Sequence, residues 1–253
     1  MKASELISSR RYAEALAELR RDLANDPEDL AVMEGMAKVL RATGEYREAL
    51  VFFERLAAHG EADSEANVMA PGSAAWQIDI ACLHWLLKDR STALRLMHWL
   101  VVGILDGSKK YGDAAGGISQ GLLLYYMAIT DNNAEETSFA LDYLRNRLKR
   151  GFSQIWPCAI AMFHLGSVAF ETVMDAVNHQ PTVVGGLDTA TAELGRRRRL
   201  CVALFHDGVR SRASGHEKHC LVRMRECSQL VNPLIEQEWY LARHEIYKAG
   251  ESG

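Results

Sequence analysis

Residues 31–56 read AVMEGMAKVLRATGEYREALVFFERL, and this stretch determines the fold that we expect. Apolar residues recur every three or four positions on each side of Gly44, which is the pattern of two amphipathic helices joined by a tight turn. The recurring residues are Met33, Met36, Ala37 and Leu40 before the turn and Ala49, Leu50, Phe53 and Leu56 after it. Because Ala37 and Ala49 are small, two helix backbones can approach each other closely there. The stretch therefore predicts an antiparallel helical hairpin, with Phe53 filling the space between successive hairpins.

The same pattern occurs 34 residues earlier in the chain. When residues 8–27 are aligned with residues 42–61, six of the twenty positions are identical, whereas chance gives about one. The identical pairs are Tyr12/Tyr46, Glu14/Glu48, Ala15/Ala49, Leu16/Leu50, Arg21/Arg55 and Ala24/Ala58. A fixed period of this length is typical of stacked helical hairpins. Such stacks form grooves and rarely build a water-excluding catalytic pocket, so the repeat favours a binding function.

A third hairpin is predicted after an insert at residues 59–73. Ala81 and Ala93 flank a turn at residues 88–90 with the same twelve-residue separation as Ala37 and Ala49. The rest of the chain shows helical stripes and no sustained two-residue alternation, so we expect no β-sheet. We predict an all-α fold of stacked antiparallel helical hairpins followed by a helical bundle. Residues 1–66 are expected to form the hairpin domain, and residues 67–253 a helical domain packed on it or continuous with it.

The first sixty residues resemble the tetratricopeptide repeat. The matching features are the turn glycine, an aromatic after it, two small residues, a bulky aromatic and a closing proline, at Gly44, Tyr46, Ala37, Ala49, Phe53 and Pro27. The resemblance implies a concave face that holds extended peptides. Glu34, Lys38 and Arg41 fall on the inner helix, opposite the Met36/Leu40 stripe, and are candidate contacts for a partner. Glu34 occupies a place where a carboxylate clamp needs a cation or an amide, so we do not expect such a clamp.

Composition and charge limit the classes of partner. Hydrophobic residues make up 48% and charged residues 25% of the 253 residues, which are ordinary values for a globular protein. The formal charge is −5 over residues 1–66, −3 over residues 67–144 and +4 over residues 145–253. Because an acidic surface repels a phosphate backbone, we expect no nucleic-acid partner and favour a basic protein partner.

Targeting signals and cysteines point to the cytoplasm. The first residues carry charges where a secretory signal needs an apolar core, and the longest apolar run, Leu96–Leu105, contains His98 and is too short to cross a bilayer. We therefore expect a cytoplasmic protein without a membrane partner. The five cysteines have no regular spacing, so we expect reduced, buried thiols and predict no cofactor and no metal.

Residues 117–121, GISQG, match the G-x-S-x-G motif. In α/β hydrolases this motif exposes a nucleophilic serine on a turn between a strand and a helix. Residues 110–115, KYGDAA, do not read as a strand. We therefore favour a small-residue packing face at Gly117 and Gly121 over a catalytic Ser119, and we predict that the chain is not an enzyme.

Two further clusters have a binding and a structural interpretation. His216, His219, Cys220 and Cys227 can share one helix face, but they would spread over about 16 Å of a single helix, whereas structural zinc sites draw ligand pairs from two segments. We expect core cysteines and surface histidines. The run RRRR at residues 196–199 is expected to be a solvated face with one or two arginines paired with acids, rather than a nucleic-acid site.

The long connection Asp106–Gly116 is a second candidate binding segment, because long loops on a rigid scaffold commonly contact partners. The candidate contacts on it are Asp106, Lys109, Lys110, Tyr111 and Asp113.

Two stretches resemble immunity proteins of bacterial polymorphic toxin systems. They are DAAGG at residues 113–117, leading into GLLLY at residues 121–125, and NPLIEQEWY at residues 232–240. Those proteins bind one cognate toxin domain and block its active site. The resemblance implies the same function here and transfers no individual residue. The alternatives are a peptide-binding adaptor or secretion chaperone that uses the same groove, and a serine hydrolase that uses Ser119.

Overall fold

The computed structural model describes residues 2–66, 74–109, 115–149, 155–179, 189–230 and 236–251. Within these ranges the chain forms thirteen helices and no strand, so the predicted all-α fold is confirmed. The chain divides into two compact units, an N-terminal unit (Met1–Tyr111) and a C-terminal unit (Gly112–Gly253).

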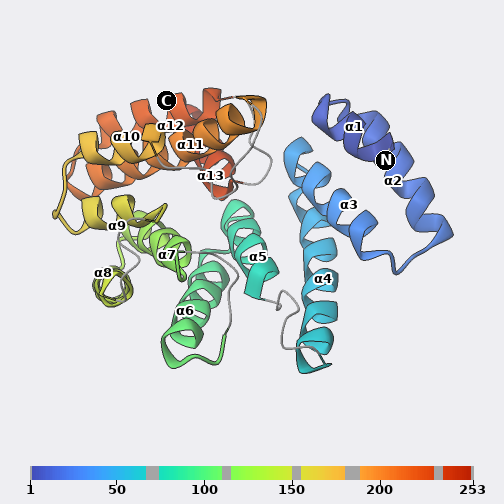
Figure 1. Cartoon of the computed structure of the whole chain (residues 1–253), viewed down its shortest axis with the longest axis horizontal. Coiled ribbons are helices and arrows are strands. Elements are labelled where there is room, and N and C mark those ends of the chain that lie inside the picture. Colours follow the sequence, from blue (N-terminus) through green and yellow to red (C-terminus); the bar gives the residue numbers. More distant parts are fainter. Residues whose placement is uncertain are drawn as a thin grey trace. The chain divides into compact units, whose positions relative to one another are not determined.

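The N-terminal unit is a stack of antiparallel helical hairpins (Figure 1). Its helices are α1 (Lys2–Ser8), α2 (Tyr12–Asn25), α3 (Leu30–Thr43), α4 (Tyr46–Ala66), α5 (Ala74–Leu86) and α6 (Arg90–Asp106). Helix α1 packs on α2, α3 on α4 and α5 on α6, while contacts of α2 with α3 and of α4 with α5 join successive hairpins. The predicted stack of hairpins is confirmed.

Capping and small side chains explain the central hairpin, α3–α4. The carboxylate of Asp29 accepts hydrogen bonds from the backbone N–H groups of Ala31 (2.9 Å) and Val32 (3.1 Å), which caps the start of α3. Helix α3 ends at Gly44, whose φ of +91° is accessible to glycine without strain. Ala37 and Ala49 are fully buried, as the sequence predicts, so the two helices pack closely.

The third hairpin, α5–α6, is built in the same way. Ala81 and Ala93 are fully buried on its two helices. At the turn between them, Asp89 accepts a hydrogen bond from the backbone N–H of Thr92 at 3.3 Å and caps α6. The buried ring of Phe53 on α4 lies 6.0 Å from the ring of Trp76 on α5. The third hairpin and the predicted position of Phe53 between hairpins are therefore confirmed.

The described part of the C-terminal unit is a helical bundle. Its helices are α7 (Ile118–Thr130), α8 (Ala134–Leu148), α9 (Cys158–His164), α10 (Phe170–His179), α11 (Thr189–Ala213), α12 (Glu217–Gln229) and α13 (Gln237–Glu251). Three neighbouring pairs, α7–α8, α11–α12 and α12–α13, make its largest contacts. Helix α7 also contacts α9 and α11, so it connects the α8 side of the bundle to the α11–α13 side.

Candidate functional site

The predicted contacts on α3 separate into a half-exposed pair and a buried residue. The side chains of Glu34 and Lys38 lie one helical turn apart, are 36% and 33% exposed, and form an ion pair with each other. Arg41, by contrast, is only 2% exposed; its guanidinium pairs with Asp79 of α5 and lies 5.5 Å from the centre of the Phe53 ring. The expectation that Arg41 faces solvent beside Glu34 and Lys38 is wrong, because the next hairpin covers it and supplies a carboxylate.

The predicted loop contacts lie only partly within the described residues. Asp106 ends α6, and its carboxylate accepts a hydrogen bond from the backbone N–H of Ser108 at 2.8 Å. Hydrogen bonds from the side chain and backbone of Ser108 lower the pKa of Asp106. Nζ of Lys109 lies 3.8 Å from the centre of the exposed Trp99 ring, a cation–π contact. Lys110, Tyr111 and Asp113 lie outside the described residues.

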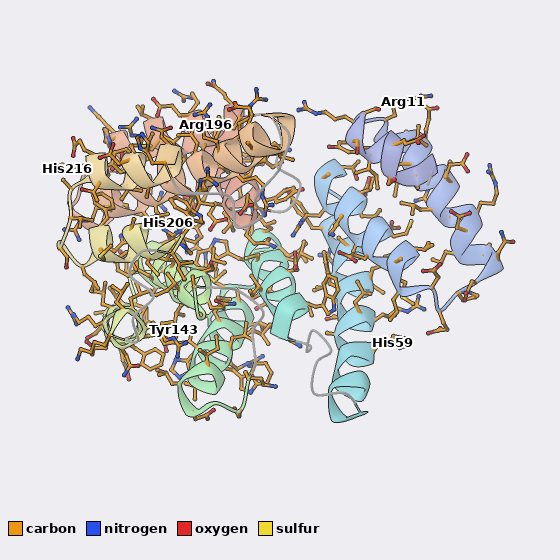
Figure 2. The ribbon with its side chains drawn as sticks, viewed as in Figure 1. Arg11, His59, Tyr143, Arg196, His206 and His216 are labelled. Atoms are coloured by element: carbon orange, nitrogen blue, oxygen red, sulfur yellow. The ribbon has the colours of Figure 1, made fainter. Side chains whose placement is uncertain are left out.

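The G-x-S-x-G motif forms the start of a helix. Ser119 is the second residue of α7, and the described residues just before that helix form a turn rather than a strand. A Cβ atom at Gly121 would lie 2.5 Å from Cδ1 of Tyr143 on α8, so the two helices approach closely there (Figure 2). The hydroxyl of Tyr143 donates to the carbonyl oxygen of Gly117 at 2.8 Å. The packing interpretation is confirmed for Gly121, and the geometry does not match a nucleophile turn.

The cysteines and histidines of α12 separate between the interior and the surface. Cys220 and Cys227 are fully buried, whereas His216 and His219 are exposed. Sγ of Cys227 lies 3.4 Å from Sγ of Cys201 on α11, and all five cysteines of the chain are free and buried. Within the described ranges no group of three or more His, Cys, Asp or Glu residues is arranged to hold a metal ion. The prediction of core cysteines and surface histidines is confirmed.

The side chains of the four consecutive arginines on α11 all bond to groups of the C-terminal unit. Three of the side chains pair with carboxylates and the fourth donates to a backbone carbonyl; the partners are Glu193 for Arg196 and Arg197, Glu236 for Arg198, and Val177 for Arg199. Hydrogen bonds from Arg196 and then Arg197 lower the pKa of Glu193 to about 2. The interpretation as a face of paired arginines is confirmed, with more pairs than the sequence predicted.

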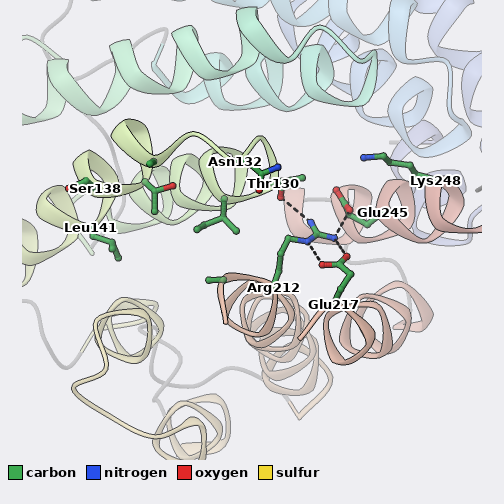
Figure 3. Close-up of a pocket in the computed structure, with 12 residues that line it drawn as sticks. Thr130, Asn132, Ser138, Leu141, Arg212, Glu217, Glu245 and Lys248 are labelled. Carbon is green, nitrogen blue, oxygen red and sulfur yellow. Dashed lines mark hydrogen bonds and ion pairs between the residues drawn. The ribbon is translucent and has the colours of Figure 1, made fainter. Parts of the chain in front are cut away.

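A pocket that the sequence does not reveal lies in the C-terminal unit (Figure 3). Its volume of about 770 Å³ falls within the range of ligand-binding pockets. The end of α7 and the first half of α8 form one wall, which includes Ile129, Thr130, Asn132, Ala134, Ser138 and Leu141. The other wall consists of the end of α11, the start of α12 and the second half of α13, and includes Arg212, Glu217, Glu245 and Lys248.

A network of ion pairs holds the second wall together. Arg212 is 13% exposed; its Nε and Nη2 donate to the carboxylate of Glu217 at 2.9 and 2.7 Å, and Nη2 also donates to Oε2 of Glu245 at 2.9 Å. Nη1 of Arg212 donates to the hydroxyl of Thr130 at 3.0 Å. The carboxylate of Glu245 is 4% exposed, and its Oε1 accepts a hydrogen bond from the hydroxyl of Tyr126 at 2.8 Å. The network therefore joins α7, α11, α12 and α13.

The network leaves the pocket without net charge. Burial acts to lower the pKa of Arg212, but the hydrogen bond with Glu217 and the charge of Glu245 outweigh it, so the pKa of Arg212 is raised and the side chain stays cationic. The hydrogen bond from Arg212 in turn lowers the pKa of Glu217. With Lys248, the lining carries two positive and two negative charges.

Two imidazoles are buried elsewhere in the C-terminal unit. Nε2 of His164 on α9 lies 3.1 Å from Nδ1 of His206 on α11, and Nε2 of His206 lies 3.7 Å from Oε1 of Glu238. Figure 2 labels His206 within the C-terminal unit. Burial, followed by the proximity of His206 and Arg210, holds the pKa of His164 well below its usual value. His164 is therefore neutral at pH 7. No sequence pattern predicts this pair, because the two residues are 42 positions apart.

Comparisons with known proteins agree with the N-terminal architecture. Residues 6–70, about a quarter of the chain, match the tetratricopeptide repeat. No curated protein matches the chain significantly. The tetratricopeptide-like repeats indicate a protein-binding or adaptor role, and domains of this kind are typically non-catalytic. Among the described residues, no helix has both the length and the apolar character needed to span a membrane.

Proposed function

We propose that the chain neutralises a cognate toxin domain by binding it and covering its active site. The observation that carries the proposal is the stack of three hairpins in the N-terminal unit, of which residues 6–70 match the tetratricopeptide repeat. Stacked hairpins present an extended surface that suits a macromolecular partner. The resemblance of residues 113–125 and 232–240 to immunity proteins supports a toxin as that partner.

The proposed mechanism is steric and electrostatic. Met1–Tyr111 contains seventeen acidic and fourteen basic residues, so the N-terminal unit has an excess of three negative charges. Acidic groups of this unit would meet the basic lip that a nuclease or nucleotide-using toxin presents to its substrate. The proposed contacts on α3 are the half-exposed pair Glu34 and Lys38. The other proposed contacts are Asp106, Lys109, Lys110, Tyr111 and Asp113 in the connection that follows α6.

The proposal predicts a large toxin gene directly upstream of this chain's gene, and co-expression with the C-terminal domain of that toxin tests it. Cells that produce the C-terminal toxin domain are expected to survive only when the chain is present.

The double reversal of Glu34→Lys with Lys38→Glu keeps the ion pair but exchanges its charges, and is expected to weaken binding of the toxin domain at least tenfold. The matched control reverses the exposed Arg11–Glu14 pair at the start of α2 and is expected to leave binding unchanged. If the wild-type chain does not rescue the cells, the proposal is wrong.

The same stack also suits a peptide-binding adaptor or secretion chaperone, because the tetratricopeptide match itself indicates protein binding. A chaperone is expected to prolong the lifetime of an exported client in a pulse–chase experiment without abolishing any toxicity. That result, together with failure of the rescue experiment, would favour this alternative. The hydrolase alternative predicts labelling of Ser119 by a fluorophosphonate probe, and we expect none.

A further inference from the structure

We infer that the pocket of the C-terminal unit binds an extended, uncharged peptide segment of the protein partner. The inference rests on the proposed function only for the identity of the partner. The class of ligand follows from the shape, the hydrogen-bonding groups and the charge of the pocket.

The α8 wall gives the pocket an elongated shape. Ala134, Ser138 and Leu141 occupy positions i, i+4 and i+7 of α8, so they lie along one face of the helix. Seven residues of helix rise by about 10 Å. An extended peptide advances by about 3.3 Å per residue, so a segment of about three residues spans this wall. The pocket volume of about 770 Å³ accommodates such a segment with its side chains.

The hydrogen-bonding groups on the α7–α8 side suit a peptide main chain. Within the described part of the chain, the side-chain amide of Asn132 and the hydroxyl of Ser138 make no hydrogen bond, and both residues are exposed. An amide and a hydroxyl each offer a donor and an acceptor. An extended peptide presents the same two kinds of group on every residue, whereas the backbone groups of a helix are already paired with each other. The pocket therefore suits an extended segment rather than a helical one.

The charges of the opposite wall favour an uncharged segment. Arg212 donates to Glu217, Glu245 and Thr130, so its guanidinium is engaged by the protein and is a poor ligand for an anion. The two carboxylates share the lining with Arg212 and Lys248, so the pocket carries no excess of negative charge that would attract a cation. Ile129 and Leu141 are only partly buried and offer an apolar contact for one side chain of the segment.

Selection of peptides on the intact chain tests this inference. A phage library of random eight-residue peptides is panned on the immobilised full-length protein, and synthetic copies of the enriched peptides are measured by fluorescence anisotropy. The enriched sequences are expected to carry no net charge and to contain an apolar residue. Ser138→Trp fills the pocket and is expected to weaken their binding at least tenfold. Asn146→Trp places the same bulk on an exposed position of α8 outside the pocket and is expected to leave binding unchanged.

Three results would overturn the inference: no sequence enriched above the bare support, enriched peptides that bind the Ser138→Trp variant as well as the wild type, and enriched peptides that are strongly charged. Circular dichroism of both tryptophan variants establishes that each is folded. The proposed function fails separately from the inference. If the wild-type chain binds the peptides at the pocket but does not rescue cells from the toxin, only the proposed function is wrong. If it rescues cells but binds no peptide, only the pocket assignment is wrong.

Discussion

The contacts within the N-terminal unit and those within the C-terminal unit differ in how far apart along the sequence their residues lie. In the N-terminal unit the same small residues recur in successive hairpins, as Ala37 and Ala49 in the second and Ala81 and Ala93 in the third. In the C-terminal unit polar contacts join residues that are far apart, with 42 positions between His164 and His206 and 119 between Tyr126 and Glu245. A repeat can be recognised from sequence because its contacts are local, whereas a bundle joined by distant polar partners cannot.

The sharpest test of this difference removes the carboxylate of Glu245. Glu245→Ala removes one buried carboxylate that accepts from both Nη2 of Arg212 and the hydroxyl of Tyr126, while Arg212 keeps its bonds to Glu217, so the C-terminal unit is expected to lose about 3 kcal/mol. Hydrogen exchange followed by mass spectrometry is expected to show faster exchange in α11–α13 and unchanged exchange in α1–α4. Glu217→Ala, at the half-exposed end of the same network, should cost no more than about 1 kcal/mol. If Glu245→Ala and Glu217→Ala reduced the stability equally, the burial of Glu245 would not explain its contribution.

A second variant tests the close approach of α7 and α8. Gly121→Ala places a methyl group against the Tyr143 ring, which its hydrogen bond to Gly117 holds in place. We expect a loss of about 1–3 kcal/mol in the free energy of unfolding, measured by urea denaturation. The matched control is Gly250→Ala on α13, where the added methyl group meets no atom within 4 Å. Because alanine has the higher helix propensity, that variant should be as stable as the wild type or more stable.

The buried imidazole of His164 makes the stability of the C-terminal unit depend on pH. Its pKa is lowered in the folded protein, so the unfolded chain binds a proton more readily, and stability falls as the pH drops below about 6.5. Urea unfolding at pH 5.5 should show a loss of up to about 1.4 kcal/mol relative to pH 7.5 from this group. His164→Phe is expected to reduce the difference between the two pH values, whereas His216→Phe, at an exposed position, should not. If the His164→Phe variant shows the same pH dependence of stability as the wild type, groups other than His164 cause that dependence.

The smallest effect is expected at the half-exposed pair Glu34 and Lys38 on α3. Lys38→Ala removes an ion pair between half-exposed side chains one turn apart, which is worth less than about 0.5 kcal/mol. A change in the unfolding midpoint within experimental error would agree with this. A loss above 1 kcal/mol would show that α3 depends strongly even on this half-exposed ion pair, and would weaken the contrast between the two units.

Much of the N-terminal unit could be predicted from the sequence, because the period places each buried residue on a known face of a known helix. The exception is Arg41, whose charge suggested an exposed side chain. Its burial depends on Asp79 in the next hairpin, 38 residues further on. Helical periodicity identifies the faces of a helix, but it does not show which of them a neighbouring hairpin covers.

The candidate sites of the C-terminal unit were harder to predict. The sequence favoured the packing role of Gly121 and the buried position of Cys220 and Cys227, because both follow from general preferences for small and apolar residues. The pocket and the Arg212 network did not follow from any local pattern. Their residues come from five helices, α7, α8, α11, α12 and α13, and only the packing of the bundle brings them together.

The hydrogen bond between Tyr126 and Glu245 also affects how the chain folds during translation. Each hairpin of the N-terminal unit can close soon after its second helix leaves the ribosome, because both helices lie within about 40 residues of each other. Helix α7 emerges early, whereas Glu245, which accepts the hydrogen bond of its Tyr126 hydroxyl, lies 119 residues further along the chain. Until α13 has been synthesised, we therefore expect the C-terminal bundle to be cleaved by proteases more readily than the hairpins that have already closed.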